Sequence, residues 1–424
     1  MEALGIYLGL FGILFVLGIP IVLSLALASI IMLVMNDVSL MVFAQKFIVS
    51  MDNYSLTAMF FFILAGEVMN GGGMTRRIVA AVSRLVKNIP GGLAIVTVVS
   101  CALFAAINGS AIATSIAIGA ILYPAMVKQG YAPAFAAAVI ASGGVVGPII
   151  PPSIPMIVYG ATTGDSIAAL FSGGFLLGIL VVAGEIIVVY LVSKKRGYGK
   201  NAEADLGSDK GIVWAVAFPV LIFGAIVGGF MTATEASAMA VLYAWFVGTF
   251  IYREFNTRDI PAMTMRAMKG SGTIMGIVGA ATAVAWVLTY ERVPQTVTEA
   301  MVSHISGSFQ FMAVTFCILF FVGMIMDLTP AILILTPIFI EPVRSFGIDP
   351  IYFGVFFCSV LTAGLITPPV GTLIYLGCST SERPFGEVVR ELLPFMAAVY
   401  GAIFVVVFFP DVITWLPKHV FNLY

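Results

Sequence analysis

Two short polar segments lie inside otherwise apolar parts of this 424-residue chain, and their residue types suit ion binding. Asn108-Gly109-Ser110 separates two apolar stretches in the first half, and Asp327 occupies the corresponding place in the second half. An acid within a membrane-length apolar region is a functional candidate by default. The structural alternative is a helix N-cap, in which the carboxylate accepts hydrogen bonds from backbone N–H groups.

Each half also contains an apolar segment that glycine and proline interrupt, at Gly147–Ser153 and at Gly364–Pro369. Proline lacks an N–H donor and clashes with a preceding carbonyl, so we predict a broken helix in each half. A break exposes carbonyl oxygens that can replace water around a small cation. It also exposes N–H groups at a positive dipole end that can bind an anion. Alternatively, the glycines only permit close packing, because glycine is common in membrane helices.

These segments define the candidate site residues. For an anionic solute we expect a polar, largely uncharged pocket formed by Asn108, Gly109, Ser110, Ser153, Asp327 and Thr329. The two breaks predict two pseudo-symmetric cation sites, the first formed by Ala105, Asn108, Gly147, Ile150 and Pro151, and the second by Gly323, Met324, Gly364, Thr367 and Val370. Each hydroxyl alone is weak support, because Ser and Thr also bond to helix carbonyls.

The coupling ion follows from the charges that this region lacks. No Lys or Arg lies deep in the expected site, so helix N-termini, hydroxyls and bound cations must balance the charge of an anion. Solute binding then depends on the cation, which is the logic of symport. Because the chain has no buried series of histidines, we favour Na⁺ over H⁺ and expect no other cofactor.

The two halves are related by a constant offset of 217 residues. It aligns a Gly, a Pro, and then the residues of the two breaks, and the matches are Gly130/Gly347, Pro133/Pro350, Gly147/Gly364, Ile149/Ile366, Pro151/Pro368, Pro152/Pro369 and Gly160/Gly377. Shared apolar composition does not explain such matches, since most involve Gly or Pro. The chain therefore contains a duplicated unit.

Composition fixes the protein class that holds this unit. Hydrophobic residues make up 61% of the chain and charged residues 10%, against about 25% charged in a soluble domain. The run Leu4–Met35 contains no Asp, Glu, Lys, Arg or His, and as one helix it would measure about 48 Å, more than a bilayer core needs. We predict an all-α polytopic membrane protein surrounded by phospholipid, with no nucleic-acid partner.

Each duplicated unit begins with two short apolar pieces that flank the polar segment. Leu93–Ile107 and Ala111–Val127 form the first pair, and the second pair runs from Phe309 to Phe339. A helix of 15 residues measures about 22 Å and is too short to span comfortably. We therefore expect re-entrant helical hairpins, whose irregular tips lie buried in protein or line a wet cavity.

The basic residues predict the orientation, because cytoplasmic loops carry an excess of Lys and Arg. With Leu4–Met35 as one crossing and each hairpin returning, the clusters at 76–87, 128, 194–210, 253–269 and 383–390 all lie inside. This path places the N-terminus in the cytoplasm and the C-terminus in the periplasm. The two hairpins enter from opposite faces, so the repeats are inverted, which is the signature of a secondary transporter.

Three further acids lie in or beside apolar segments. Glu235 follows Thr232 by three residues, which is the spacing of a capping box and favours a structural role. Glu67 and Glu185 could pair with a partner subunit or face a cavity, and the sequence does not decide between these roles.

The motifs resemble those of the large membrane subunit of tripartite ATP-independent periplasmic (TRAP) transporters, over essentially the whole chain. The segments that carry this resemblance are Asn108-Gly109-Ser110, Gly147–Ser153, Gly229–Ala236 and Gly364–Pro369. The resemblance implies an inverted-repeat, elevator-type ion transporter fold in a bacterial inner membrane. It also implies Na⁺-driven uptake of a carboxylate-bearing solute, and the similarity favours the sialic acid branch over C4-dicarboxylates.

The resemblance further implies two partners, a small four-helix membrane subunit expected as a separate chain and a periplasmic substrate-binding protein. It divides the chain into scaffold helices, transport repeats and a C-terminal helix, with boundaries that we place at 1–92, 93–166, 167–305, 306–378 and 379–424. One alternative is a self-sufficient divalent-anion/Na⁺ symporter without a binding protein. A remote alternative is an intramembrane enzyme that uses Asp327 with Glu67 or Glu185, which the pairing of Asp327 with Asn108 disfavours.

Overall fold

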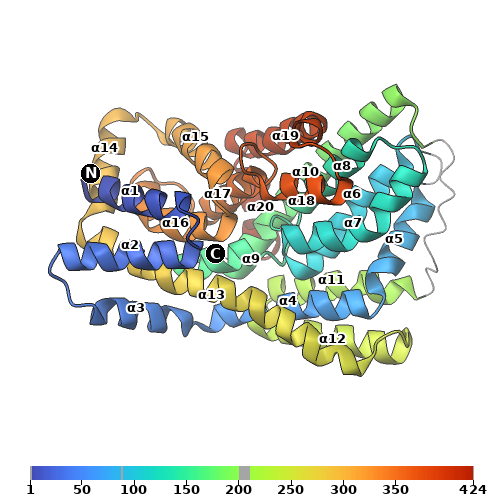
Figure 1. Cartoon of the computed structure of the whole chain (residues 1–424), viewed down its shortest axis with the longest axis horizontal. Helices are drawn as coiled ribbons and strands as arrows, with labels where there is room; N and C mark the ends of the chain where they lie inside the picture. Colours follow the sequence, from blue (N-terminus) through green and yellow to red (C-terminus); the bar gives the residue numbers. More distant parts are fainter. Residues whose placement is uncertain (1, 87–88, 200–210, 424) are drawn as a thin grey trace.

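The computed structural model describes residues 2–86, 89–199 and 211–423, and every regular element in those ranges is helical (Figure 1). In these ranges seven helices are long and apolar enough to cross a membrane, or eight if one bent pair counts as a span. The predicted all-α polytopic membrane fold is therefore confirmed. Lys87, Lys200 and Lys210, on which the orientation partly depends, lie outside the described residues.

The first repeat contains the predicted hairpin and broken helix. Its elements are α6 (Gly92–Asn108), α7 (Ala111–Lys128), α8 (Pro133–Val145) and α9 (Ile154–Thr163). Gly109 ends α6 because its φ of +62° lies in the left-handed region that favours glycine. Ser110 caps α7, and Ser153 caps α9 after the break.

The second repeat has the same order of elements, namely α15 (Ser308–Ile325), α16 (Leu328–Ser345), α17 (Pro350–Gly364) and α18 (Thr372–Ser381). Both breaks contain a cis peptide bond at matched positions, Pro151–Pro152 and Pro368–Pro369. The returning helix α16 continues to Ser345, beyond the end that we predicted at Phe339. Proline interrupts a membrane helix less than a soluble one, since neighbouring groups satisfy the freed carbonyls.

The other helices surround these two repeats. They are α1 (Glu2–Val16), α2 (Ile21–Met35), α3 (Met41–Met51), α4 (Tyr54–Gly71), α5 (Met74–Leu85), α10 (Ile167–Arg196), α11 (Ile212–Val227), α12 (Ala233–Phe246), α13 (Ile260–Tyr290), α14 (Val293–His304), α19 (Phe385–Phe408) and α20 (Asp411–Trp415). Short π-helical turns follow α12 and α20, at Val247–Ile251 and Leu416–Val420, and a 3₁₀ turn at Thr257–Asp259 precedes α13.

We expected the N-terminal apolar run to form one helix, but the structure shows two. Gly18 adopts a φ of +80° and Pro20 lacks an N–H donor, so the chain turns between α1 and α2, which pack against each other. Each has 15 residues and measures about 22 Å, less than the roughly 30 Å of a bilayer core. The prediction of a single first crossing is therefore wrong.

Two further boundaries differ from the prediction. The polar stretch Asn36–Asn53 contains a helix, α3, which continues into α4 through a bend of 57°. The apolar pattern predicts a span from Thr273 to Tyr290. Helix α13 begins 13 residues before Thr273, so it also includes Arg266 and Lys269. Both helices contain polar residues on exposed positions, which a hydropathy pattern does not count as helical.

The broken helices form the centre of the molecule. Every residue of α8 from Ala134 onward and of α17 from Ile351 onward is buried. Helix α10 packs against α8, α9, α17 and α19, and thus covers both repeats. On another side, α2, α3, α4 and α12 pack against α13 or against one another. Of these helices, α3, α4, α12 and α13 lie at the bottom of Figure 1.

Ion pairs join basic clusters that lie far apart in the sequence. Arg77 contacts Glu254 at 2.8 Å, and its guanidinium carbon lies 3.7 Å from the centre of the Tyr252 ring. Burial is the main cause that raises the pKa of Tyr252 to about 12. Arg196 pairs with Glu391 at 2.9 Å, which connects the end of α10 to the start of α19.

Candidate functional site

The first hairpin tip packs directly on the first helix break. A Cβ atom added to Gly109 would lie 2.4 Å from the carbonyl oxygen of Pro152, and one added to Gly147 would lie 2.9 Å from that of Ser110. The N–H of Ile154 donates to the carbonyl of Gly109 over 3.5 Å. The structure therefore brings the predicted tip residues to the predicted break, with glycine at the two closest contacts.

Asn108 organises this tip from within. Its Oδ1 accepts hydrogen bonds from the N–H of Ser110 at 2.7 Å and from the hydroxyl of Thr114 at 3.2 Å. Its Nδ2 is buried and has no hydrogen-bond partner among the described residues. A Cβ atom on Gly66 of α4 would lie 2.8 Å from Cβ of Asn108, so α4 closes over the tip. The sequence interpretation had not included Thr114 or Gly66.

The other residues of the first predicted cation site lie around this contact. The carbonyl of Ala105 accepts the N–H of Gly109 at 3.1 Å, and the N–H of Ile150 donates to Val146 at 2.9 Å. Ser153 is fully buried, and its hydroxyl donates to the carbonyl of Pro148.

The second tip and break make a matching backbone contact. A Cβ atom on Gly364 would lie 2.4 Å from the carbonyl oxygen of Gly323, and the N–H of Val370 donates to the carbonyl of Met324 at 3.2 Å. The hydroxyl of Thr367 donates to the carbonyl of Ala363 at 2.8 Å. All five residues of the second predicted cation site are thus brought together.

Tyr400 of α19 joins this second site, and the sequence interpretation had missed it. Its hydroxyl lies 2.8 Å from that of Thr367. Because Thr367 uses its single hydrogen toward a carbonyl, Tyr400 is the donor in this contact. Tyr400 lies in an ordinary transmembrane helix, so only its position in the fold reveals the contact.

We expect Gly364→Ala to disrupt the second site. The added methyl group would meet backbone atoms of Gly323, which cannot turn aside, and overpacking of this kind costs typically about 1–3 kcal/mol. Uptake in proteoliposomes should fall strongly, and the melting temperature in detergent should drop. Gly401→Ala is the matched control, since no atom lies within 4 Å of its added Cβ. Equal effects of the two substitutions would contradict this contact.

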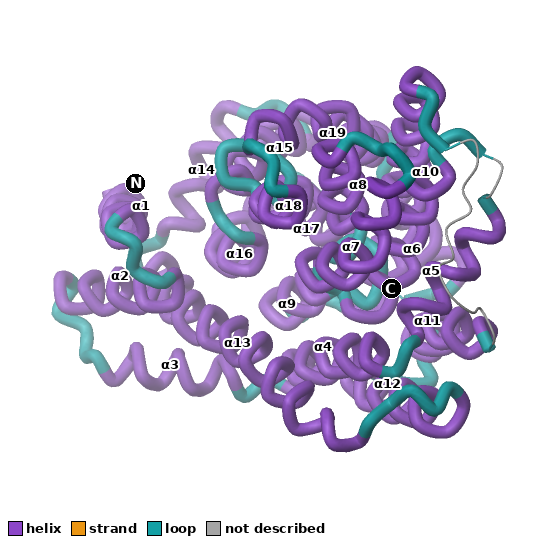
Figure 2. The backbone as a smooth tube through the Cα atoms, turned by 45° about the vertical axis from the view of Figure 1, so that its right-hand side comes forward, coloured by secondary structure: helices purple, strands orange, loops and turns teal. Residues whose placement is uncertain are grey.

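The two hairpin tips share one cavity of about 160 Å³. Among its described lining residues are four of the six predicted for the solute, namely Gly109, Ser110, Asp327 and Thr329. Helix α9 packs against α16 beside this cavity (Figure 2). No described Lys, Arg or His lines it. The N-termini of α7 and α16 both lie at its wall, so their N–H groups and dipole ends favour an anion there.

Asp327 stands at the N-cap position of α16 with extended backbone angles, but its side chain makes no capping hydrogen bond. The N–H of Leu328, at the first helical position, is a backbone donor beside this carboxylate, whereas an N-cap side chain accepts from the second or third position. The hydrogen bond that defines an N-cap is thus not made. Asp349 provides the contrast, since its Oδ1 accepts the N–H groups of Ile351 and Tyr352 at 3.0 Å each. Asp349 thus caps its helix, whereas Asp327 makes no capping hydrogen bond and lines the cavity.

A second cavity of about 340 Å³ adjoins the first and shares Ser110, Ile112, Ile154 and Ile274 with it. Its walls include α4 residues that the sequence interpretation did not assign, at Ile63, Gly66, Glu67 and Asn70, together with Asn108 from the tip. The periodic spacing of these α4 residues is that of one helix face. No sequence motif marks this face, because its residues are brought to the cavity only by the packing of α4 opposite the tip.

The remaining acids have defined surroundings. Glu67 lines the second cavity and pairs with Arg266, whose Nε lies 2.7 Å from Oε2. Glu185 is fully buried and accepts a hydrogen bond from Ser142. Glu235 completes the predicted capping box with Thr232, which confirms its structural role. The described residues contain no group of three or more His, Cys, Asp or Glu side chains that could hold a metal ion.

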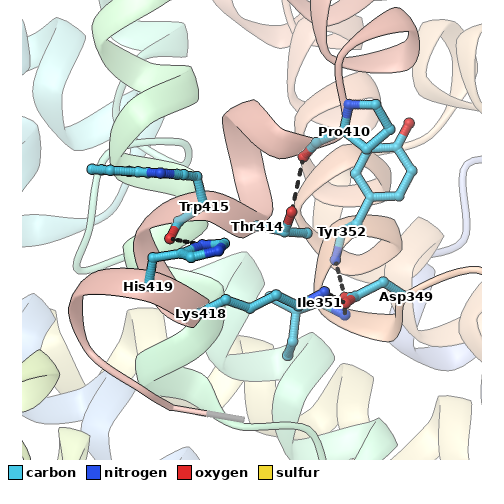
Figure 3. A network of polar contacts seen from close by, with 8 residues as sticks. All are labelled: Asp349, Ile351, Tyr352, Pro410, Thr414, Trp415, Lys418 and His419. Carbon is cyan, nitrogen blue, oxygen red and sulfur yellow. Dashed lines mark hydrogen bonds and ion pairs between the residues drawn. The ribbon is translucent and has the colours of Figure 1, made fainter.

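A further polar network lies between the start of α17 and the C-terminal turns (Figure 3). Lys418 pairs with Asp349 at 2.7 Å, and the hydroxyl of Thr414 donates to the carbonyl of Pro410 at 3.4 Å. A cavity of about 320 Å³ adjoins these residues. The network attaches the C-terminal segment to α17 and is remote from the hairpin tips in sequence and in its lining residues.

Two hairpins, two helices broken at matched positions and a cavity between the tips define a repeat-based membrane transporter. The chain belongs to the family described as "Tripartite ATP-independent periplasmic transporter, DctM component", whose model matches residues 8–412. This confirms the resemblance noted from the sequence. The chain is therefore a large permease component for secondary transport of organic acids, and not an enzyme.

Individual relatives agree with this assignment. The chain is 37% identical to the 2,3-diketo-L-gulonate TRAP transporter large permease protein YiaN of Escherichia coli, over 94% of this chain and 95% of the relative. It is 36% identical to the C4-dicarboxylate TRAP transporter large permease protein DctM of Vibrio cholerae, over 95% and 94%. The solved structure of Neisseria gonorrhoeae MtrF shares the fold, with a TM-score of 0.62 at 15% identity over 86% of this chain and 82% of that one.

Proposed function

We propose that this chain carries a carboxylate-bearing sugar acid across the bacterial inner membrane in symport with Na⁺. The observation that supports this most is the cavity between the tips, where two helix N-termini meet Asp327 and no described basic residue is present. A carboxylate can bind at the helix N-termini. Asp327 then suits the hydroxyl groups of a sugar acid, which donate hydrogen bonds, better than a second carboxylate.

The proposed solute class includes N-acetylneuraminate, which the sequence resemblance favours over C4-dicarboxylates. The Escherichia coli relative, named for the sugar acid 2,3-diketo-L-gulonate, adds support for this class, while the Vibrio cholerae relative is named for C4-dicarboxylates. We propose that Asn108, Gly109, Ser110, Asp327 and Thr329 contact the solute. Ser153 acts indirectly, because it is buried against Pro148 and lines neither cavity.

We propose one Na⁺ at each break, held by the residues named for the two sites. The second site offers the hydroxyl of Thr367, whereas Ile150 occupies the matched position in the first. Tyr400 orients that hydroxyl and leaves one of its lone pairs for the cation. The two sites would therefore differ in chemistry, with the first made of backbone carbonyls and the Asn108 side chain.

We propose an elevator mechanism in which the repeats move as one unit past a scaffold. The sequence-based division placed α10 in the scaffold, within 167–305. The packing of α10 on helices of both repeats supports assigning it to the transport unit, together with α19, which packs on α8 and α17. We propose that α4 and α13 remain in the scaffold. Glu185 supports the same division, because its hydrogen bond with Ser142 joins α10 to α8.

We propose that the basic clusters face the cytoplasm, because cytoplasmic loops carry an excess of Lys and Arg. The C-terminus then lies in the periplasm. Because α1 and α2 form a hairpin rather than one crossing, the same rule places the N-terminus outside, contrary to the cytoplasmic position expected from the sequence.

Reconstituted uptake tests this function and its partners. Family membership implies association with a small membrane subunit and a periplasmic binding protein. We expect uptake of radiolabelled N-acetylneuraminate only when both partners are present with this chain. Succinate as competitor should reduce uptake less than unlabelled sugar acid does. Uptake by this chain alone would instead favour the self-sufficient symporter, and preferred uptake of succinate would overturn the sugar-acid assignment.

A further inference from the structure

Glu67 lines the second cavity and pairs with Arg266, which lies beside the cavity and is not one of its described lining residues. On α4, Ile63, Gly66, Glu67 and Asn70 line this cavity. On α13, Gly270 and Ile274 line it, and Ile274 also lines the cavity between the tips. Arg266 precedes Gly270 by one helical turn and therefore lies on the same face of α13. The second cavity thus leads from the tips toward this ion pair.

The distance along α13 between Ile274 and Arg266 is suited to the transfer of a small solute. Ile274 and Arg266 are eight residues apart, which corresponds to about 12 Å along a helix. Gly270 lies between them on that face of α13, and Ile63 of α4 is the nearest side chain there, 3.8 Å from where a Cβ atom of Gly270 would lie. A sugar acid leaving the tips could exchange the helix N-termini for Arg266 in one short step.

Arg266 retains the chemistry that a carboxylate needs. A guanidinium carries five N–H donors, and Arg266 uses its Nε toward Glu67 in the single hydrogen bond found for it among the described residues. Its side chain is 56% exposed. The terminal nitrogens therefore present a planar pair of donors, which matches the two oxygens of a carboxylate.

We propose that Arg266 is a second anion site, which receives the carboxylate of the solute as it leaves the tips for the cytoplasm. This inference rests on the proposed function, which supplies the anionic solute and its direction. Glu67 is the resident counter-charge, and it competes with the solute for the guanidinium. Competition from Glu67 keeps binding at Arg266 weak enough for release. Contact between the carboxylate and the guanidinium lowers the free energy of the solute at the exit.

Exchange from the lumen of oriented proteoliposomes tests the site. The complete complex is reconstituted with its cytoplasmic face toward the lumen and with Na⁺ on both sides. Exchange of N-acetylneuraminate is then measured as a function of its lumenal concentration. If the uptake experiment selects the dicarboxylate, succinate is the solute used. We expect Arg266→Gln to raise the half-saturating lumenal concentration about tenfold or more, as loss of a charge-assisted hydrogen bond implies. The external solute concentration at half-maximal exchange depends on the tips and the binding protein, so it should not change.

Glu67→Gln separates an anion site from a structural ion pair. Neutralising Glu67 removes the competitor, so the half-saturating lumenal concentration should fall, in the opposite direction to Arg266→Gln. A pair that only joined α4 to α13 would give shifts of the same direction in both variants, and that result overturns the proposal. Arg77→Gln is the matched control, because Arg77 also pairs with a glutamate and lines neither cavity.

The outcome also distinguishes this inference from the proposed function. If the wild-type complex exchanges none of the tested organic acids, the proposed function fails. If it exchanges them and Arg266→Gln leaves the lumenal half-saturation unchanged, only the second anion site is refuted. An equal shift in the Arg77→Gln control would likewise refute it.

Discussion

Asp327→Ala is expected to reduce uptake to background while the protein still folds and reaches the membrane. The acid lies on the wall of the cavity between the tips, and its side chain makes no capping hydrogen bond. Its loss should therefore cost little stability. A hydrogen bond to a charged group is worth roughly 1.5–3 kcal/mol, so a solute hydroxyl that loses this acceptor should bind about 10- to 100-fold more weakly. Uptake and the melting temperature in detergent are the two measurements.

Asp349→Ala is the matched control for this prediction, because Asp349 caps α17 and pairs with Lys418. Loss of an N-cap costs about 0.5–2 kcal/mol, so this variant should melt earlier and still transport. Asp327→Asn adds a second comparison, since it keeps an acceptor and removes the charge. Uptake at the wild-type rate in Asp327→Ala would refute the assigned role of the acid.

Replacement of Na⁺ by choline is the second large effect that we expect, with uptake falling to background. The cavity between the tips contains no described basic residue, so an organic anion there depends on cations at the two breaks. Choline is too large to be coordinated by carbonyls spaced for a small ion. Radiolabelled uptake with equal ionic strength in both buffers measures the effect. Transport that persists unchanged in choline would eliminate Na⁺ as the coupling ion.

Thr367→Val narrows the Na⁺ prediction to one site. The substitution keeps the shape of the side chain and removes the hydroxyl that Tyr400 orients. We expect a higher Na⁺ concentration at half-maximal uptake, with little change in the amount of protein in the membrane. Tyr352→Phe is a control for the loss of a buried hydroxyl, because Tyr352 donates to Val406 in the same unit and away from the break. Matching Na⁺ curves for Thr367→Val and wild type would remove this hydroxyl from the site.

The hydropathy pattern was a reliable guide where helices end at glycine, proline or a capping residue. Both hairpins begin and end within a few residues of the prediction, apart from the end of α16, and both helices break within a few residues of the predicted positions. It failed where composition hides a turn or a helix. Gly18 and Pro20 divide a run that contains no charge, and α13 continues through Arg266 because a helix can place basic residues on an exposed face.

The sequence by itself determined the duplicated unit, the polar tips and the residues at each break, because glycine and proline act on the backbone locally. It also identified Asp327 as the acid to test. Only the tertiary structure decided that the two tips share one cavity and that Asp327 does not cap its helix. The same holds for Tyr400 beside Thr367, and for Glu67 beside Arg266, which are separated by 199 residues. Such contacts depend on how distant helices pack, and ordinary residues on a helix face carry no local signal of their partner.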